Sequence, residues 1–403
     1  MDNSFQAFSK LLAYCEANDW AGYDPFDALN SRVFQTLPLL DKKIPRLILT
    51  QALKRSPINI RPLALVPKSQ NPKAMGLFLT AFLRLSEKEV PNREQLIGKM
   101  IERIVALRSP AQKYWCWGYN FPWQMRTELV PMGAPNLVTT YFVASALLAA
   151  YEQRRDRMCL EIAVSAADYI HDELFRSEGE VAMFRYPLPT DYVPIHNANF
   201  LAAELLCRVA KLTGENRYLG RALAVTRYSV NCQAADGSWE YGSSKVQSWI
   251  DNFHTGYNLC ALKDLGKHLQ TSEFEESVRK GYKFYRDRFF REDGAAKYFH
   301  DRVYPIDIHS VAQSIITLHA FREEDPGAPA QARKVLDWAM RNMWNPKGYF
   351  AYRVLRSCTI RTPYMRWSEA WMLLALAEVI RTETPQESRP EFSGAKRAVS
   401  AWA

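Results

Sequence analysis

The chain has 403 residues, 48% of them hydrophobic and 24% charged, which is the composition of a globular protein long enough to bury a large core. Its formal net charge is +9, but the Lys and Arg residues are scattered and no nucleic-acid-binding motif is present, so no nucleic-acid partner is expected. The positive balance suits an anionic sugar equally well. The seven cysteines form no CxxC pair, which excludes the common zinc and disulfide patterns.

The N-terminus shows no targeting signal. A basic segment followed by an uninterrupted apolar run is missing from the first 20 residues, and no stretch approaches the ~18 apolar residues that a transmembrane helix needs. We therefore expect a cytoplasmic protein without a transmembrane segment.

The first part of the chain is expected to be an irregular arm, residues 1–44. Apolar residues recur at helical spacing from Ser4 to Asn18, and a turn-rich aromatic stretch, GYDPFDALNSRVF, follows from Gly22. Helices are predicted over 45–54, 72–85 and 92–107. At the other end, residues 382–403 are polar and lack periodicity, so we expect a flexible tail.

Between these ends the chain is periodic. Polar or aromatic residues open apolar helical segments at positions 136, 196, 251, 309 and 364, which are 60, 55, 58 and 55 residues apart. Outer helices are predicted at about 157–174, 216–232, 272–290 and 329–343, and short loops of alternating aromatic and polar residues precede the polar-headed helices. Six such helix pairs need roughly 340 residues. We therefore predict an all-α fold, an (α/α)6 toroid over residues 45–381, in which the inner helices begin around one mouth.

Several segments carry a resemblance to known proteins. GYDPFDALNS, NPKAMGLFLTAFLRL, WGYNFPWQ, GAPNLVTTYF, HNANFLAAELL, DGSWEYG, WIDNFHTGY, YPIDIHSVAQ and YMRWSEAW resemble an incompletely characterised family of bacterial exopolysaccharide gene clusters, with a toroid of the six-hairpin glycosidase and terpenoid-cyclase type. The resemblance runs from Gly22 to about Ala377 and implies the ring fold and a link to surface-polysaccharide biosynthesis.

A second resemblance concerns one loop. Gln233, Gly237 and Trp239 match the QW signature of triterpene cyclases, where the motif is structural and fastens an outer helix to its loop. The DxDD and DDxxD motifs of prenyl chemistry are absent, so isoprenoid chemistry is a minor alternative.

The densest cluster of polar chemistry is SWIDNFHTGY, residues 248–257. Asp251 is expected to cap a helix, which is the commonest structural role of Asp at such a position, or to act as a base or an electrostatic anchor. His254, three residues later, is either a structural histidine or an Asp-oriented general base. Asp307 and His309 repeat the pattern at the next inner helix, and His196 with Asn197 and Asn199 provides a third histidine-bearing helix start.

The last inner helix offers a further pair. Glu369 and Arg366 either form an ion pair over Trp367 or contact the substrate, Arg366 by holding a uronate carboxylate and Glu369 by protonating or attacking the anomeric carbon. No HxH or HxxxH spacing occurs, and neither a metal nor a cofactor is expected. The predicted catalytic residues are Asp251, His254, Asp307, His309 and Glu369. The predicted substrate-binding residues are Trp117, Tyr119, Trp123, Asp191, His196, Asn197, Trp239, Tyr241, Trp249, Asn252, Tyr257, Arg366 and Trp367.

These residues lead to one functional hypothesis and two alternatives. The leading hypothesis is an enzyme that cleaves or trims an oligosaccharide or polysaccharide, neutral or anionic, as a hydrolase or a lyase. For a lyase, Tyr119 and Tyr257 are candidate acids or bases. One alternative is a sugar epimerase using His254 and His309, by resemblance to N-acylglucosamine 2-epimerase-like enzymes, in which two histidines face each other across the toroid. The other is a non-catalytic glycan-binding or scaffold subunit. The sequence leaves the oligomeric state open.

Overall fold

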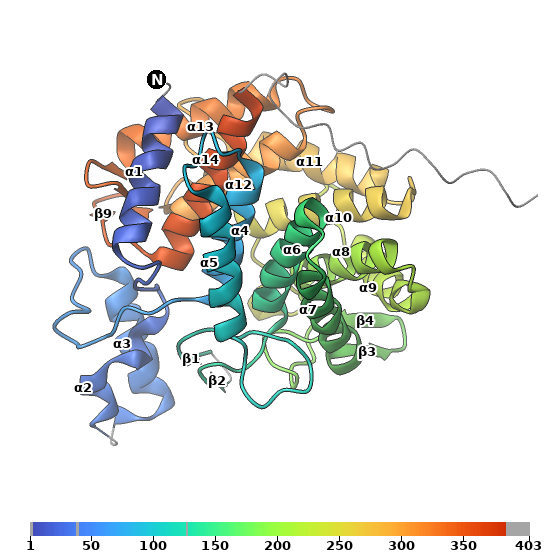
Figure 1. The fold of residues 1–403 in the computed structure, drawn as a ribbon, viewed down its shortest axis with the longest axis horizontal. Coiled ribbons are helices and arrows are strands. Elements are labelled where there is room, and N and C mark those ends of the chain that lie inside the picture. The colour runs from blue at the N-terminus through green and yellow to red at the C-terminus, as the bar shows by residue number, and fades with distance from the viewer. Residues whose placement is uncertain (1–2, 38–39, 126–127, 384–403) are drawn as a thin grey trace, which may run out of the picture.

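The computed structural model describes residues 3–37, 40–125 and 128–383. Within these ranges, long helices form an inner ring, each in contact with the next and the last with the first (Figure 1). The predicted all-α toroid is thereby confirmed. The inner helices are α4 (Pro72–Arg84), α6 (Leu137–Arg154), α8 (His196–Thr213), α10 (Asn252–Leu269), α12 (Ile308–Ala320) and α14 (Ala370–Glu383).

A second layer of helices packs against the outside of the ring. Inner helices such as α8 are buried on nearly all sides, whereas outer helices bury a single stripe, as α5 does with apolar residues at positions 96, 97, 100, 101 and 104. The outer helices are α1 (Asn3–Ala17), α5 (Arg93–Ala106), α7 (Arg157–Asp168), α9 (Leu219–Asn231), α11 (Glu275–Phe289) and α13 (Ala328–Asn342).

The ring is completed by the two ends of the described chain. Helix α1 packs along α14, so part of the segment expected to be an irregular arm supplies the outer helix of the last pair. The physical reason is its apolar stripe of Phe8, Leu11, Leu12 and Cys15, all buried. The helix expected over 45–54 is present as α3 (Lys43–Arg55), but it buries only Thr50 and Leu53 and packs outside the ring.

Residues 23–37 and 40–68 form a separate lobe, which we call the basal lobe, attached where Gly22 and Ser69 pair in a short antiparallel bridge. In Figure 1 it stands off the ring at the lower left. It contains α3, the 3-10 helix η1 (Asp27–Asn30) and the short helix α2 (Arg32–Gln35). Its own apolar core consists of Ala28, Leu53 and Val66, with partly buried residues around them.

Short strands and turns connect the helices, as the alternating aromatic loops predicted. They are the paired strands β1 (Trp123–Gln124) and β2 (Leu129–Val130), β3 (Phe175–Glu178) and β4 (Val181–Phe184), β6 (Trp344–Asn345) and β7 (Tyr349–Phe350), and the three-stranded β5 (Ile306–Asp307), β8 (Arg353–Val354) and β9 (Thr359–Ile360). Two π-helical turns, η3 (Tyr169–Leu174) and η6 (Met365–Glu369), and two 3-10 turns, η4 (Asn216–Tyr218) and η5 (Lys245–Gln247), complete the elements.

Two predictions concern the remaining parts of the chain. Helix α14 continues to Glu383, so the expected tail begins within it, and residues 384–403 lie outside the described residues. None of the described helices combines the length and the hydropathy that a membrane span requires.

Candidate active site

The inner helices begin at one end of the ring, which we call the mouth, and several begin at the polar residues that the sequence singled out. Asn136 caps α6 by accepting a hydrogen bond from the Thr139 amide, and Asp251 and Asp307 cap α10 and α12 by accepting from the amides of His254 and His309. These caps satisfy backbone N–H groups that a helix start leaves unpaired. The capping role expected of Asp251 is therefore confirmed.

Asp251 also positions the imidazole of His254. Its Oδ2 accepts hydrogen bonds from His254 Nδ1 at 2.7 Å and from Trp249 Nε1 at 2.9 Å. The carboxylate is fully buried, while the His254 side chain is 20% exposed. Because Nδ1 carries the proton that it donates to the carboxylate, Nε2 holds the free lone pair, and the dyad has the arrangement of an Asp-oriented general base.

An aromatic surface adjoins this dyad. The rings of Tyr241 and Trp249 stack with centroids 4.5 Å apart and planes 13° from parallel, and the His254 ring lies 4.6 Å from Tyr241. Trp249 is 36% exposed, whereas Tyr241 is partly buried. A flat exposed ring next to a general base is suited to stacking on the apolar face of a sugar.

His309 has a different environment from the one expected. Its Nε2 lies 2.5 Å from the hydroxyl of Tyr257, and its ring packs against Phe253 and Trp367. Burial, together with the nearby positive charges of Lys73 and Arg366, holds the pKa of His309 well below its usual value. The neutral ring therefore accepts a hydrogen bond from the Tyr257 hydroxyl at Nε2, and its buried Nδ1 has no partner among the described residues.

The two histidines do not face each other across the ring. His254 and His309 lie on the neighbouring helices α10 and α12, and the ring of Phe253 lies between them, 4.1 Å from one and 4.5 Å from the other. The opposed pair that the epimerase alternative invoked is therefore not the arrangement seen here. Tyr257 connects the two groups instead, because its ring contacts both imidazoles.

Lys73, in the first turn of α4, is the main residue that the sequence analysis missed. It is 3% exposed, and its Nζ lies 4.1 Å from the centroid of Phe142, 5.3 Å from Trp371 and 5.5 Å from Tyr257. No described carboxylate pairs with it, and burial holds its pKa well below the usual value. Burial thus disfavours the charged form of Lys73 while no anion lies beside it, and an incoming anion would favour that form, so the cage of rings is suited to binding an anion.

The rings around Lys73 separate the mouth from a cavity on the axis of the ring. Phe142, Tyr257 and Trp371 line this cavity of 320 Å³, together with residues from later turns of the inner helices, including Glu204 and Asp264. The aromatic cage thus forms the floor of the site.

Asp307 does not repeat the arrangement of Asp251. Its Oδ2 accepts two hydrogen bonds from Arg353, at 2.8 and 2.6 Å, and its Oδ1 accepts one from Trp367 Nε1 at 2.9 Å. The carboxylate is fully buried and orients Trp367 and Arg353. Its contact with His309 is through the backbone amide of that residue.

The pair expected between Arg366 and Glu369 is not formed. Arg366 donates two hydrogen bonds, of 2.6 and 2.8 Å, to Asp24 of the basal lobe. Glu369 accepts from the Phe350 amide and lies near Tyr14 and Tyr349, where burial raises its pKa well above the usual value. The two residues lie in the π-helical turn η6, whose wider turn gives positions three apart different directions from those in an α-helix.

The aromatic residues near Arg366 form a cluster. Tyr119 stacks on Phe121 with planes 3° apart and meets the edge of Trp123, while the Arg366 guanidinium lies 4.9 Å from the Tyr119 centroid. Trp123 and Trp367 both contact Phe26 of the basal lobe. This wall of the mouth is therefore built jointly by the ring and the lobe.

Several predicted substrate-binding residues have structural contacts instead. Trp117 and Trp239 are buried and donate to the carbonyls of Ile104 and Ser229, while Gln233 binds the Gly237 carbonyl as the QW resemblance implied. Others are bound within the protein: His196 contacts Ser229 of α9, Asn252 accepts from Tyr285 of α11 and Ser314 of α12, and Asp191 accepts from the Leu188 amide. Asn197 is buried, with its Oδ1 unpartnered among the described residues.

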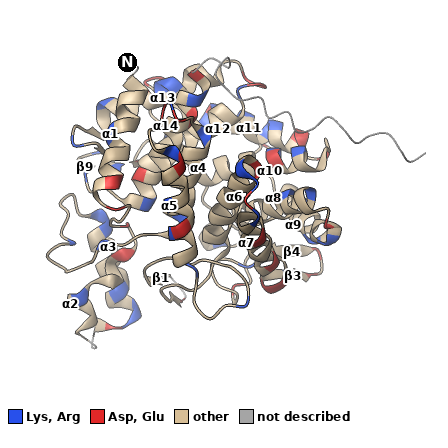
Figure 2. Cartoon of the chain, viewed as in Figure 1, with Lys and Arg blue, Asp and Glu red and all other residues tan. Residues whose placement is uncertain are grey.

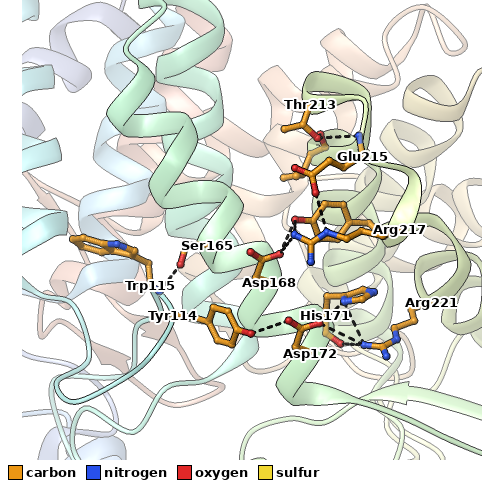
Figure 3. A network of polar contacts seen from close by, with 12 residues as sticks. Tyr114, Trp115, Ser165, Asp168, His171, Asp172, Thr213, Glu215, Arg217 and Arg221 are labelled. Atoms are coloured by element: carbon orange, nitrogen blue, oxygen red, sulfur yellow. Dashed lines mark hydrogen bonds and ion pairs between the residues drawn. The ribbon is translucent and has the colours of Figure 1, made fainter.

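An aspartate–histidine pair on the outer layer provides a contrast. His171 and Asp172 lie in η3, where Asp172 also accepts from Tyr114 and Arg221 binds the His171 carbonyl (Figure 3). Nearby Arg217 donates to Asp168 in the same network, which fastens α7 and η3 to α9. The polar groups of this pair are bound to Tyr114 and Arg221, and the His171 ring packs against Tyr218, which indicates a structural function. Within the described ranges, no group of His, Cys, Asp and Glu side chains is arranged as metal ligands.

Comparison with solved structures identifies similar folds. The cellobiose 2-epimerase of Bacillus thermoamylovorans superposes with a TM-score of 0.61 at 10% identity, covering 79% of this chain and 90% of the epimerase. A D-mannose isomerase gives a TM-score of 0.58 at 12% identity, covering 77% and 86%. The GH76 α-mannanase BT2949 of Bacteroides thetaiotaomicron gives 0.58 at 11% identity, with the same coverage. These likenesses show the fold.

No family model and no curated protein sequence matches this chain. The fold is therefore established by the structure, while the chemistry has to be argued from the site.

Proposed function

We propose that this protein is a carbohydrate-active enzyme that removes the proton next to the carboxylate of a uronate residue in a bacterial surface polysaccharide. The observation that carries the proposal is the dyad of Asp251 and His254 together with the unpaired amine of Lys73, both of which lie near the ring of Tyr257. Removal of a proton next to a carboxylate needs a base that takes the proton and a positive charge that stabilises the carboxylate. The names of the structural neighbours describe enzymes that act on sugars. The link to a surface polysaccharide rests on the motif resemblance given in the sequence analysis.

The first step would use the free Nε2 of His254. It takes the proton from C5 of the uronate, while Lys73 neutralises the carboxylate that receives the negative charge. The C4–O bond then breaks, its electron pair leaves with the oxygen, and a C4=C5 double bond forms. The His254 imidazolium, held by Asp251, returns its proton to the leaving oxygen. The overall reaction is the β-elimination of a lyase and needs no water or co-reactant.

Hydrolysis receives less support from the geometry. A glycosidase uses two carboxyl groups that flank the scissile bond. The side chains of Asp251 and Asp307 are fully buried and saturated with hydrogen bonds, and Glu369 lies at the outer layer. Asp251 and Asp307 therefore have both oxygens occupied by contacts within the protein, and Glu369 faces β7 and Tyr14 of α1.

Epimerisation is the second candidate, because it begins with the same proton transfer. The specific observation in its favour is the hydrogen bond between Tyr257 and His309. The Tyr257 hydroxyl is a second proton donor, and its ring also contacts His254. In that case Tyr257 returns the proton to the opposite face of C5 and no bond to C4 breaks. A Tyr257→Phe variant would then lose epimerisation but keep elimination.

The test is incubation of the full chain with uronate-containing and neutral oligosaccharides in deuterated buffer. Elimination gives an unsaturated end that absorbs in the ultraviolet, and epimerisation gives deuterium in an intact sugar. We expect His254→Ala to lower the rate by about 10²- to 10⁴-fold. His300→Ala, a partly exposed histidine outside the dyad, is the matched control. Unmodified hydrolytic products would support the hydrolase, and binding without product would support the scaffold alternative.

Lys73 provides an independent check of the substrate class. We expect Lys73→Met to remove the preference for acidic over neutral sugars, because a methionine fills the same cage without charge. Retention of that preference by the variant would contradict the anion-binding role.

A further inference from the structure

The basal lobe has an unusual distribution of apolar side chains. Of the sixteen large hydrophobic residues exposed on the described chain, eight lie between residues 33 and 65. The most exposed of these eight are Leu63 at 83%, Ile58 at 72%, Ile44 at 69% and Ile48 at 63%. The lobe thus buries small residues such as Ala28 while leaving large aliphatic ones in solvent, which marks an interaction surface.

Helix α3 presents part of this surface as a continuous face. Ile44, Ile48, Gln51 and Arg55 are spaced by four, three and four residues, and all are exposed. The opposite side buries Thr50 and Leu53 against the lobe. The loop after α3 adds Leu63 and Leu65, and Leu65 takes a φ of +50°, which is uncommon for a leucine and keeps its side chain outward.

The charge of the lobe indicates which partner this face fits. Residues 23–68 contain eight Lys and Arg against three Asp, a formal +5 of the total +9 of the chain, and burial lowers the pKa of one of the eight, Lys54, to about 7. Asp24 and Asp27 are buried and bound to Arg366 and Arg61, respectively. Among the described residues of the lobe, Asp41 is therefore the acidic residue that is exposed. Exposed cations flank the apolar face, and Figure 2 shows Lys and Arg on α2 and α3.

We infer that the outer face of the basal lobe docks on the surface of an anionic lipid bilayer. Apolar residues beside cations, on a helix too short to span, have the character of an interfacial membrane anchor. A second copy of this chain would place +5 against +5 and is disfavoured. The inner side of the lobe contacts Arg366 and Trp367 through Asp24 and Phe26, so docking holds the mouth near the membrane. This inference does not depend on the reaction proposed above.

The test is co-sedimentation of the full chain with vesicles of phosphatidylcholine alone or mixed with phosphatidylglycerol. We expect at least about tenfold tighter binding to the anionic vesicles, weakened by salt. The variants Ile44→Ser/Ile48→Ser and Lys42→Glu/Lys43→Glu should each weaken binding about tenfold or more. Val246→Ser, an equally exposed aliphatic residue outside the lobe, is the control and should bind as the original chain does.

Three results would overturn the inference. They are absence of binding to anionic vesicles at low salt, binding that the lobe variants leave unchanged, and a concentration-dependent dimer that the Ile44→Ser/Ile48→Ser variant abolishes. Circular dichroism of each variant establishes that it is folded. The substituted side chains are on the surface, so loss of the fold is not expected.

Discussion

Asp251 and Asp307 show how two similar residues acquire different roles. Each caps an inner helix through one carboxylate oxygen, and each is followed by a histidine within three residues. The second oxygen decides the difference, because Asp251 binds His254, whereas Asp307 binds Arg353, 46 residues further along the chain. Local sequence spacing predicted the caps but carries no information about that distant partner.

Buried neutral histidines predict a loss of stability in acid. Burial lowers the pKa of His196 to about 4, below its value in the unfolded chain. Between pH 6.5 and about 4 the unfolded chain binds more protons, so the free energy of unfolding falls as the pH falls through this range, by at most about 3 kcal/mol for this residue. Urea unfolding at several pH values measures the slope.

A variant identifies the contribution of His196. His196→Asn retains a partner for Ser229 but does not titrate, so its stability should depend less steeply on pH. His309 and His319 have lowered pKa values as well, so part of the slope should remain. An unchanged slope in the variant would show that other groups cause the acid sensitivity.

The ion pair between Asp24 and Arg366 is expected to hold the basal lobe on the ring. Both side chains are almost completely buried, so Asp24→Asn leaves an uncompensated buried charge and should cost about 3–5 kcal/mol. Hydrogen exchange should rise chiefly within residues 23–68. Asp41→Asn, which breaks an exposed pair with Arg46, should cost less than about 1 kcal/mol; equal costs would contradict the prediction.

At the scale of helices, packing distances decide which glycines tolerate a side chain. A Cβ added at Gly281 of α11 would lie 2.6 Å from the Trp239 ring. A Cβ added at Gly98 of α5 would have no neighbouring atom within 4 Å. We expect Gly281→Ala to destabilise by about 1–3 kcal/mol and Gly98→Ala to stabilise by about 0.5–1 kcal/mol. Thermal unfolding of both variants tests this, and destabilisation by both would contradict it.

The π-helical turn η6 shows an element that the sequence did not reveal. Residues 364–380 are predicted as one apolar helical segment starting at Tyr364, but residues 365–369 form a π turn before α14 begins. The wider turn directs Arg366 and Trp367 towards the lobe and mouth and Glu369 towards the outer layer. Hydrophobic periodicity reports an average over several turns, so a single altered turn leaves no clear signal.

At the scale of the whole molecule, the toroid is closed by its first and last described helices. Leu11 of α1 is completely buried in the same core as the inner helices, although it lies more than 350 residues from α14 in sequence. We expect Leu11→Ala to destabilise the protein by about 2–5 kcal/mol. Denaturant unfolding measures the change, and Leu63→Ala, on the exposed face of the lobe, is the control with an expected effect within about 0.5 kcal/mol. Similar effects at both positions would indicate that α1 is not part of the cooperative ring.

The sequence by itself determined the repeating helix pairs, the caps of the inner helices and the stretch that contains His254, because periodicity and capping depend on residues close together in the chain. Only the tertiary structure decided which capping aspartate orients a histidine, which carboxylates are occupied by hydrogen bonds from distant residues, and where the Lys73 side chain lies. Lys73 follows the cap of an ordinary amphipathic helix, and its significance comes from Phe142, Tyr257 and Trp371, which belong to three other helices. The membership of α1 in the ring depended in the same way on contacts between distant segments, which no local pattern encodes.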